Sequence, residues 1–554
     1  MLTRGRGYPD LYKSFRWRIP RQFNIGVDIA DKHRAGDIAM LHVTADGSVQ
    51  EIPFGHLRAQ SNRLANALIA KGFRRGDRVA ILAGQRPEAV IALAGIVKAG
   101  MIAVPLNPLL DKEALRFRLA ATGARGVVAD AAGLEMLAPI RPDLDELSLI
   151  LALDEGGDGA TAFQQLLDRS SDAFQAPHTL ADDPALILFT HGTMGRPKPV
   201  LHAHRALLGQ LPGLEFALDF LPEKGDRLWT TFDWSSRNGL LGAVLPALHH
   251  GVPVLAWSEP AFDPEKAFIH ITRNEIRNAV LPVGTLRSLG RVTDPRGRFR
   301  PKLRSVASTG ASLPPEVQDW GRSAFGLTIN EFYSQTESGP VIANCAGMIE
   351  VRPGSLGRAV PGHAIAVVDE EGRDLPPGET GMIAVRRGDQ GTFLGYWNDD
   401  VSTVAKYVGP WLATGDFGRR DHTGYVWFVD RGDEVIVSGG QRIGPSEVES
   451  CLMRHPAVKM AAAIGVPDAT QGEVVKAIIV LKPGRRGDGA LTREIQDFAK
   501  RGLVSQAWPR AIEFVPELPM TAAGKVLRDA LRIQHGEHRG AGGAHGGVSR
   551  LSEV

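Results

Sequence analysis

The chain has 554 residues, and its 64 lysines and arginines nearly balance its 62 aspartates and glutamates, which leaves a formal net charge of +2. This balance excludes a strong overall field that would recruit nucleic acid or an anionic membrane, although it leaves room for a local basic patch. The cysteines, Cys345 and Cys451, are too few for a disulfide framework or a cysteine zinc site, and they indicate a reducing compartment.

The first part of the chain combines a basic terminus with an apolar stretch. Residues 1–20 are basic but lack the apolar core of a signal peptide, so the sequence favours a cytoplasmic protein. Residues 54–73 place apolar side chains at helical spacing, and the apolar run at 76–82 predicts a strand. The most apolar stretch, 89–106, is interrupted by a lysine, two glycines and a proline, so it predicts a helix and a buried strand rather than a membrane span.

Helical and strand patterns keep alternating further along the chain. Such alternation favours an α/β fold with largely parallel sheets. Near Arg431 the glycine-rich loops give way to a compact set of expected elements. The alternating segments lie at 215–221, 303–309 and 381–387, and the compact set has helices at 445–456 and 492–503 and strands at 458–466, 474–481 and 511–515.

Three regions are predicted from these patterns. A large N-terminal α/β domain with several sheets should span residues 1–432. A small α+β C-terminal domain should span 433–535, and the glycine-rich stretch at 536–554 should be disordered.

The segment 189–200, FTHGTMGRPKPV, follows an expected strand and is rich in glycine, lysine and proline. Its glycines permit tight turns in which backbone N–H groups converge on an anion, and Lys198 can add a positive charge. The spacing is not that of the P-loop ATPases, because no G-K-[ST] ends the loop and two prolines discourage a following helix. Taken alone, the segment fits a phosphate loop and an ordinary surface loop equally well.

Four further segments favour the phosphate loop. They are NEFYSQTES at 330–338, WLATGDFG at 411–418, the charged stretch 429–449, and PMTAAGKVLR at 519–528. In order and spacing, the five segments together resemble the adenylate-forming, or AMP-binding, superfamily. Within it the chain looks most like the acetyl-type and medium-chain acyl-CoA synthetases, and the resemblance covers nearly the whole chain.

The resemblance implies an acid-thiol ligase that works in two half-reactions. ATP converts a carboxylic acid to an acyl-adenylate with release of pyrophosphate, and the thiol of CoA then displaces AMP. ATP, Mg²⁺ and CoA are the implied cofactors, a small carboxylic acid of fatty acid metabolism is the implied partner, and no nucleic acid or integral membrane segment is expected. The protein side of adenylation is mainly the placement of charge around the α-phosphate.

Roles at the phosphates also follow from the resemblance. Thr336 should touch the α-phosphate, and Glu337 should bind Mg²⁺, a hard cation that prefers carboxylate and phosphate oxygens. Lys525 should act in catalysis on the carboxylate and α-phosphate oxygens. The β- and γ-phosphates should be held by Thr190, Thr193, Gly195 and Lys198.

Other residues should hold the nucleoside. Tyr333 should lie against adenine, and Asp416 should accept hydrogen bonds from the ribose hydroxyls. Plainer alternatives remain open: a helix cap for Thr336 and Glu337, an Asx-turn for Asp416, a surface charge for Lys525, and core packing for Tyr333. The other cofactor-binding residues implied by the family are Gly310, Ala311, Ser312, Arg431 and Arg442.

The acyl pocket is less clearly specified by the sequence. Acetate-limited relatives carry a tryptophan where this chain has Ser334, so a short- to medium-chain or aromatic acid is expected. Phe232 and Trp234 favour an apolar substrate. Arg237 either pairs with a second polar or acidic group of the substrate or faces solvent or CoA.

Two features of the sequence bear on how well such an enzyme would work. Asp433 stands at the position of the family hinge, about which the small domain is expected to be mobile between the half-reactions.

The phosphate loop departs from the family pattern at His191, Met194 and Pro199, which removes two hydroxyl groups and one backbone N–H. The alternative function is therefore a nucleotide- or acyl-adenylate-binding protein with weakened or lost adenylation. An adenylation domain that loads a carrier protein is a third, weaker reading.

Overall fold

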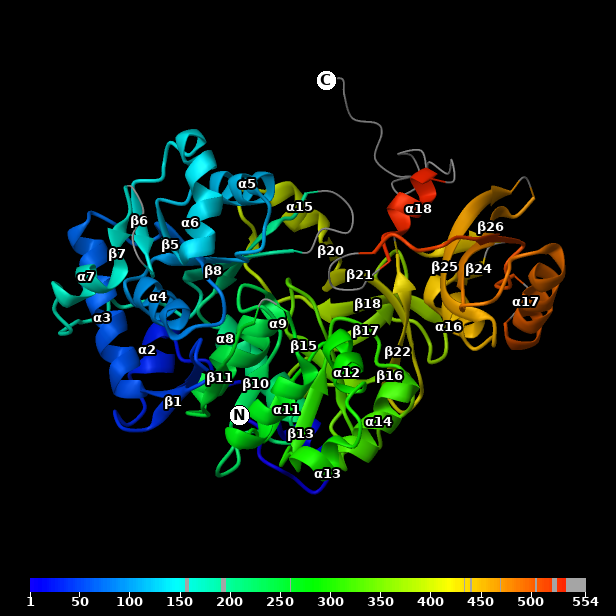
Figure 1. Cartoon of the computed structure of the whole chain (residues 1–554), viewed down its shortest axis with the longest axis horizontal. Coiled ribbons are helices and arrows are strands. Elements are labelled where there is room, and N and C mark those ends of the chain that lie inside the picture. The colour runs from blue at the N-terminus through cyan, green and yellow to red at the C-terminus, as the bar shows by residue number, and fades with distance from the viewer. Residues whose placement is uncertain are drawn as a thin grey trace. The chain divides into compact units, whose positions relative to one another are not determined.

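The computed structural model describes residues 1–154, 159–190, 196–259, 261–432, 434–438, 441–468, 470–503, 506–520 and 526–534. Contacts between residues divide it into two compact units. The first unit comprises 1–378, 384–414 and 420–427, and the second comprises 379–383, 415–419 and the chain from 428 onward. Figure 1 labels the elements of both units.

The first unit contains a largely parallel sheet in the strand order β19-β9-β8-β4-β3-β5-β6-β7. The pairs formed among strands β3, β4, β5, β6, β7 and β8 are all parallel, while β9 is antiparallel to both β8 and β19. The strands are β3 (Arg78–Leu82), β4 (Ile102–Leu106), β5 (Gly126–Ala129), β6 (Leu149–Ala152), β7 (Thr161–Ala162), β8 (Pro184–Phe189), β9 (Pro199–Ala203) and β19 (Gly395–Tyr396).

A second sheet of the first unit runs in the order β16-β15-β14-β13-β12-β10-β11-β1-β2. Its central strands β10 to β14 are parallel, and β15 turns back antiparallel to β14. The strands are β1 (Ile38–Val43), β2 (Val49–Pro53), β10 (Leu228–Thr230), β11 (Val254–Ala256), β12 (Asn278–Val280), β13 (Ser305–Ser308), β14 (Asn330–Ser334), β15 (Pro340–Ala343) and β16 (Ser355–Ala359). Five more strands follow: β17 (Ile365–Val368), β18 (Thr380–Arg386), β20 (Tyr407–Val408), β21 (Trp411–Arg420) and β22 (Tyr425–Arg431).

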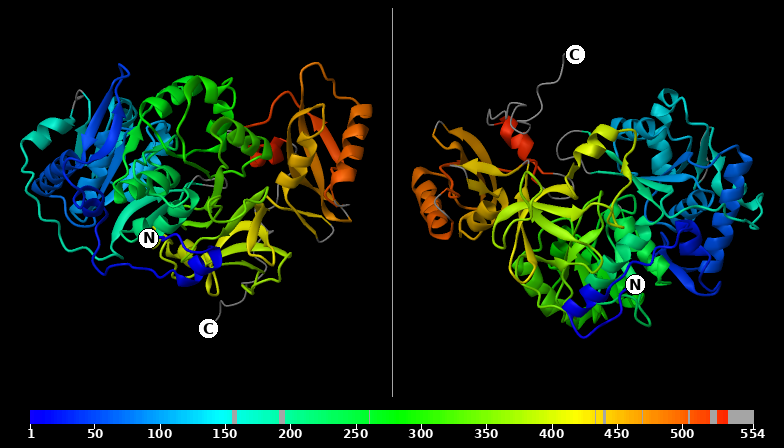
Figure 2. Two further views of the ribbon diagram at one scale, coloured as in Figure 1. Left: turned by 90° about the horizontal axis from the view of Figure 1, so that it is seen from below. Right: turned by 180° about the vertical axis from the view of Figure 1, so that it is seen from behind.

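Helices cover these sheets, as the two further views of Figure 2 show, and α3 and α4 lie side by side in Figure 1. The π-helical turn η2 continues directly from α9 into α10. The helical segments are α1 (Tyr8–Ser14), α2 (Ile25–Ala30), α3 (Phe54–Ala70), α4 (Pro87–Lys98), α5 (Lys112–Thr122), α6 (Ala131–Leu137), η1 (Ala138–Asp143), α7 (Phe163–Asp168), α8 (Ala206–Ala217), α9 (Arg237–Gly239), η2 (Leu240–Val244), α10 (Leu245–His249), α11 (Pro264–Arg273), α12 (Val283–Leu289), α13 (Pro295–Phe299), α14 (Pro315–Phe325) and α15 (Asp400–Ala405).

The second unit holds a sheet in the order β24-β23-β26-β25, with β27 parallel to β26. Strands β25 and β26 form a long antiparallel pair, and α16 and α17 contribute to the apolar cluster built on it. The elements are β23 (Ile436–Ser438), β24 (Gln441–Ile443), α16 (Pro445–Met453), β25 (Val458–Asp468), β26 (Gly472–Leu481), α17 (Gly489–Gly502), β27 (Ala511–Phe514) and α18 (Arg528–Gln534). The predicted fold class, a large α/β part with several sheets and a smaller α+β part, is confirmed.

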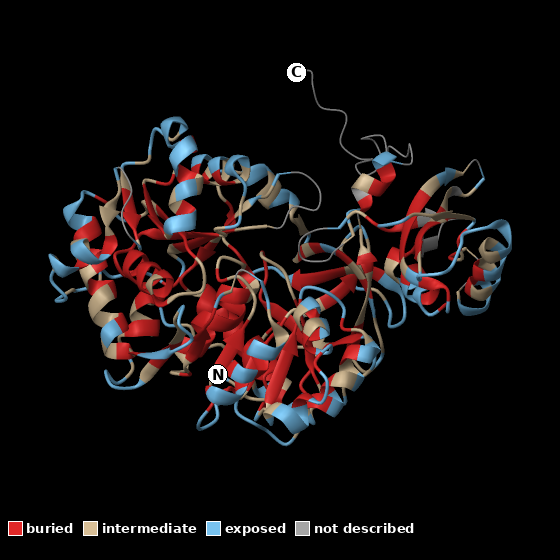
Figure 3. Ribbon diagram, in the orientation of Figure 1, coloured by how far each residue is buried: buried red, intermediate tan, exposed pale blue. Residues whose placement is uncertain are grey.

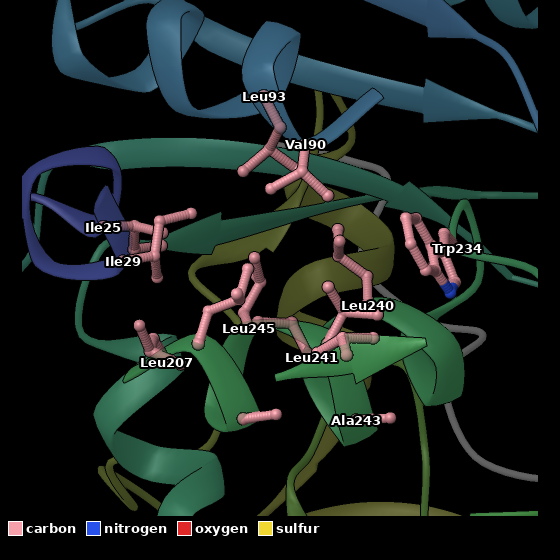
Figure 4. Packing of buried hydrophobic residues seen from close by; sticks show 14 of the residues in the cluster. Ile25, Ile29, Val90, Leu93, Leu207, Trp234, Leu240, Leu241, Ala243 and Leu245 are labelled. Carbon is pink, nitrogen blue, oxygen red and sulfur yellow. The ribbon is translucent and has the colours of Figure 1, made fainter. Parts of the chain in front are cut away.

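The strands of both large sheets are mostly buried, whereas the outer helices mix buried and exposed positions, as Figure 3 shows. The largest apolar cluster joins α3 and α4 to α8 and to the helical run that begins at α9. Figure 4 shows one part of it, in which Trp234 lies beside Leu240 at the edge of the aliphatic side chains. No described helix is long and apolar enough to cross a membrane.

Candidate active site

The two ends of the predicted phosphate loop are held together by the hairpin of β8 and β9. The backbone N–H of Thr190 donates to the carbonyl oxygen of Lys198 at 3.0 Å. In return, the backbone N–H of Lys198 donates to Oγ1 of Thr190, also at 3.0 Å. The loop between them, 191–195, lies outside the described residues, and with it the predicted positions Thr193 and Gly195 and the departures His191 and Met194.

The third departure, Pro199, opens strand β9 opposite Phe189 of β8. Its carbonyl oxygen accepts a hydrogen bond from the backbone N–H of Trp397 at 2.8 Å. A proline cannot donate to a sheet, so it is best tolerated at the start of a strand, which is where this one stands. The proline therefore fits the hairpin that closes the loop.

Lys198 and Glu337 are brought together through a residue that the sequence did not single out, Tyr396. The ammonium group of Lys198 lies 4.8 Å from the centre of the Tyr396 ring, and it donates a hydrogen bond to Oγ of Ser402 at 2.6 Å. The hydroxyl of Tyr396 donates to Oε1 of Glu337 at 2.6 Å. Burial, together with the negative charge of Glu337, raises the pKa of Tyr396, so its hydroxyl stays protonated as a donor. Pairing of β19 with β9 places this tyrosine, and no local sequence pattern marks it.

Thr336 and Glu337 lie in the turn that joins β14 to β15, and neither caps a helix. Glu337 is only 7% exposed, and its carbonyl oxygen accepts from the backbone N–H of Phe393 at 2.9 Å. The side-chain amide of Gln335 donates to the carbonyl oxygen of Thr414 at 2.9 Å. The turn is thus anchored on both sides, and it holds a nearly buried carboxylate against the hydroxyl of Tyr396. A single carboxylate of this kind suits Mg²⁺, which proteins commonly bind through one or two carboxylates together with substrate phosphates.

The predicted adenine border lies next to a buried carboxyl group that sequence reasoning missed. Gly310, with φ of +87°, begins an exposed turn that follows β13 and continues through Ala311 and Ser312. The backbone N–H of Leu313, immediately after that turn, donates to Oε2 of Glu331 at 3.3 Å. Glu331 and Tyr333 stand two residues apart on β14 and therefore point to the same face of the sheet. The position of a glutamate within a strand is the sequence feature that could have indicated the buried carboxyl group of Glu331.

Burial raises the pKa of Glu331 from 4.5 to about 8, while the Leu313 N–H acts in the opposite direction. A raised carboxyl pKa stabilises the fold fully below about pH 4.5, and this contribution is lost as the pH rises through the folded pKa. Across that window we expect the wild type to lose up to about 1.4 kcal/mol per pH unit relative to Glu331→Gln. Urea denaturation at pH 5 and pH 8 measures the difference between the two proteins. Equal pH slopes for both would contradict the buried, protonated state.

The predicted acyl-pocket residues belong to one buried region of the first unit. Trp234 is 4% exposed and packs in the main apolar cluster, and Phe232 packs against the same cluster. Arg237 is also buried, so the alternative in which it faces solvent is wrong. The side chains of Arg237 and Ser334 both donate to Oδ1 of Asn238, each at 3.2 Å. The structure therefore brings the two segments of the predicted pocket, 232–237 and the one that carries Ser334, together.

The remaining predicted residues belong to the second unit. Asp416 is a buried residue of β21, and Arg431 is a half-buried residue at the end of β22. Arg442 lies in β24, with its side chain outside the described part of the structure. Asp433 and Lys525 are also outside the described residues, but Met520 and Val526, on either side of the segment that contains Lys525, pair as an isolated antiparallel bridge.

His202 on β9 and His204, which directly follows the strand, do not form a metal site with other described residues. His204 accepts a hydrogen bond from the backbone N–H of Ile25 at 3.1 Å through Nδ1. Burial lowers the pKa of His202 to about 3 and that of His204 to about 4, so both rings are neutral at pH 7. Within the described ranges, no group of three or more histidine, cysteine, aspartate or glutamate side chains is placed to hold a metal ion.

Comparison with known proteins identifies the family. Residues 29–397 match the family model of the AMP-binding enzyme, and residues 447–525 match that of the AMP-binding enzyme C-terminal domain. The chain is 33% identical over 534 residues to acyl-coenzyme A synthetase ACSM4, mitochondrial, of Homo sapiens, an alignment that covers 93% of this chain and 91% of the relative. It is 31% identical over 546 residues to the acetyl-coenzyme A synthetase of Bacillus subtilis, covering 95% of each protein.

Solved structures agree with the sequence relatives. The anthranilate CoA ligase AuaEII in complex with anthranoyl-AMP superposes with a TM-score of 0.82 at 30% identity, covering 93% of this chain and 98% of that one. The predicted ATP, Mg²⁺ and CoA, with a small carboxylic acid as partner, are confirmed at the level of the family. The chain belongs to the AMP-binding enzyme family, in which it is an ATP-dependent acyl-CoA synthetase, an acid-thiol ligase.

Proposed function

We propose that the enzyme activates a carboxylic acid larger than acetate, with a short- to medium-chain or aromatic apolar body, as its acyl-adenylate and then as its CoA thioester. The observation that carries the proposal is the contact of Lys198 and Glu337 through Tyr396, which is a preformed place for the charge of ATP and its metal. Ser334, where acetate-limited relatives have tryptophan, leaves room for the larger acid. Anthranilate, the acid for which a structurally similar CoA ligase is named, is an aromatic acid larger than acetate.

Each group in the site has a chemical role in this proposal. Lys198 and Thr190, with Thr193 and Gly195, hold the β- and γ-phosphates. Glu337, whose carboxylate is fixed by Tyr396, would hold Mg²⁺, which would neutralise phosphate charge. Thr336 orients the α-phosphate, and Lys525 stabilises the charge that develops as the carboxylate attacks. Adenine lies between Tyr333 and the turn of Gly310, Ala311 and Ser312, and the nucleoside is completed by Asp416, Arg431 and Arg442.

Adenylation and thioester formation place different demands on Lys525, which must act in the first step and clear the way for pantetheine in the second. We assign the hinge for this exchange to Asp433, and the domain boundary to 432/433. Proline at this position fixes φ. Asp433→Pro should therefore impair thioester formation far more than pyrophosphate exchange, and an equal loss in both assays would refute the hinge.

The alternative, a nucleotide-binding protein that has lost adenylation, is not favoured, because relatives that align with 93% and 95% of this chain are named as synthetases. The decisive experiment is exchange of pyrophosphate into ATP with a panel of carboxylic acids, followed by CoA-dependent release of AMP. We expect exchange with acids larger than acetate and weak exchange with acetate. Binding of ATP without exchange for any acid would favour the alternative instead.

The compartment is part of the same proposal. Both cysteines are free and buried, which fits a reducing compartment, so we assign the enzyme to the cytoplasm. Cell fractionation that recovered the protein with an organelle or outside the cell would overturn this assignment.

A further inference from the structure

Arg237 is a buried cation for which the described residues provide no anionic partner. Its side chain is 5% exposed, at the start of α9. Nη2 donates to Oε1 of Gln210 on α8, and Nη1 donates to Oδ1 of Asn238 at 3.2 Å. Both partners are neutral amides, and Nε has no hydrogen-bond partner among the described residues. The structure records no carboxylate partner for Arg237 within the described part of the chain.

Burying the Arg237 guanidinium without a counter-ion costs the protein folding free energy. A guanidinium has five N–H donors in a planar fork that matches a carboxylate, and among the described residues this fork meets two amide oxygens. Burial lowers the pKa of Arg237 to about 9, still well above neutral, so the group is charged at pH 7. Buried charges in proteins are normally paired, because desolvation without a counter-ion costs several kcal/mol. Elsewhere in the same unit Arg304 follows the rule, with Nη2 at 2.8 Å from Oδ2 of Asp226.

Other polar atoms of the region are also without partners. Nε1 of Trp234 and both ring nitrogens of His202 are buried, and none of them makes a hydrogen bond to a described residue. The positive charge of Arg237 contributes to the low pKa of His202, which places the two side chains within electrostatic reach. The indole and the neutral imidazole each offer an N–H donor. Each of these N–H groups therefore needs a hydrogen-bond acceptor, and the described residues do not supply one.

The cluster adjoins the segment that holds the reacting groups. Asn238, which accepts from Arg237, also accepts from Ser334 of the Y-x-Q-T-E segment. On the other side, a Cβ atom placed on Gly339 would lie 3.3 Å from Oε1 of Gln210, so Gln210 packs against the end of the turn that carries Glu337. Arg237 is thus connected to the active-site turn through two side-chain amides, that of Asn238 at Ser334 and that of Gln210 at Gly339. This spacing suits an acid whose far end, rather than its reacting carboxylate, meets the guanidinium.

We propose that Arg237 binds a second carboxylate on the acyl substrate, so that the enzyme's acid is a dicarboxylate with an apolar body, activated at one end and held by Arg237 at the other. The inference rests on the proposed function and specifies its substrate class. Gln210 and Asn238 orient the guanidinium, and Trp234 provides the apolar wall. The substrate supplies the missing counter-ion, and acids without the second carboxylate leave the buried charge unpaired.

Matched acids test the proposal with the full-length enzyme. Pyrophosphate exchange is measured with isophthalate and its monomethyl ester, and with adipate and its monomethyl ester, pairs that keep the carbon body and remove one negative charge. We expect wild-type kcat/KM for the diacid to exceed that for the ester by about 10- to 100-fold in at least one pair, as for a hydrogen-bonded ion pair. Equal values for diacid and ester in both pairs would overturn the inference.

Two variants separate binding of the second carboxylate from a structural role. Arg237→Gln should lower kcat/KM for the preferred diacid by about 10- to 100-fold and leave the ester within about threefold. Gln210→Glu should supply an internal counter-ion, so we expect it to raise the Tm and to abolish the preference for the diacid. Arg237→Lys keeps the charge but loses the fork, and it should fall between wild type and Arg237→Gln.

Arg304 provides the control for the loss of a buried or half-buried arginine. Arg304→Gln removes a paired arginine from the same unit and should lower the Tm without changing the ratio of diacid to ester. An equal loss for diacid and ester in Arg237→Gln would place Arg237 on the reacting carboxylate or on the nucleotide, and would overturn the inference. Exchange with monoacids alone would overturn the inference but keep the proposed function. No exchange with any acid would overturn both.

Discussion

Glu337→Gln is expected to lower the rate of pyrophosphate exchange at saturating ATP and acid by about 100-fold or more, the size of effect seen when one preorganised charged or polar group is removed from an active site. The substitution keeps the shape of the side chain and its acceptor oxygen. It removes the negative charge that a hard cation requires. We therefore also expect the Mg²⁺ concentration for half-maximal exchange to rise.

The surroundings of Glu337 explain why the loss should fall on kcat. The carboxylate is nearly buried, and Tyr396 holds it through Oε1 at 2.6 Å, so its orientation is set before ATP arrives. Such preorganisation contributes at the transition state rather than to ground-state binding. Tyr396→Phe removes the hydroxyl and leaves the charge, and its loss should be smaller, about tenfold, as for one hydrogen bond to a charged group.

A matched control is available in the same unit. The side chain of Glu350 is 80% exposed and lies 3.9 Å from Arg352, so Glu350→Gln should exchange pyrophosphate at the wild-type rate. Exchange rates are measured across a Mg²⁺ series for the three variants. A wild-type rate in Glu337→Gln together with an unchanged Mg²⁺ concentration for half-maximal exchange would remove Glu337 from the metal and require another ligand.

Elements with strong local signals were predicted well from the sequence. The helix at 54–73 and the strand at 76–82 are present as α3 and β3, and the apolar stretch at 89–106 forms α4 and β4, as predicted. Helix α17 begins at Gly489, three residues before the predicted start at Thr492. The side chain of Asp488 accepts from the backbone N–H groups of residues 490 and 491 and so caps the helix earlier.

The site was only partly predictable, because its residues are assembled by long-range pairing. Motif spacing indicated Lys198 and Glu337 separately, but their connection through Tyr396 depends on the pairing of β19 with β9. Arg237 was noticed as a charge among apolar residues, with three possible environments. Its burial and its neutral partner Gln210 follow from the packing of α8 against the active-site turn, which no local pattern encodes.

Arg528→Met is expected to lower the free energy of unfolding of the second unit by about 3–5 kcal/mol, the usual effect of breaking a buried ion pair from one side. Arg528 is 7% exposed at the start of α18. Its Nη2 lies 2.8 Å from both carboxylate oxygens of Glu449, and its Nη1 lies 2.6 Å from Oε2 of Glu434. Without the guanidinium, two buried carboxylates would face each other with no cation between them.

The same contacts connect stability to catalysis. Arg528 ties α18 to α16, and it follows the predicted catalytic Lys525 by three residues. Its loss should therefore reduce adenylation even below the unfolding transition, because the segment that carries Lys525 loses its anchor. Hydrogen exchange of peptides from α16 and β26 reports on the second unit alone, and pyrophosphate exchange reports on the site.

Partner variants show whether the effect is electrostatic. Arg528→Met combined with Glu434→Gln and Glu449→Gln removes the facing charges and should recover at least half of the lost stability, since a buried pair replaced as a whole costs less than one broken in half. Lys500→Met, which breaks an exposed ion pair with Asp497 in the same unit, should cost no more than about 1 kcal/mol. If Arg528→Met cost no more than Lys500→Met, the buried pair would not be what holds α18 to the second unit.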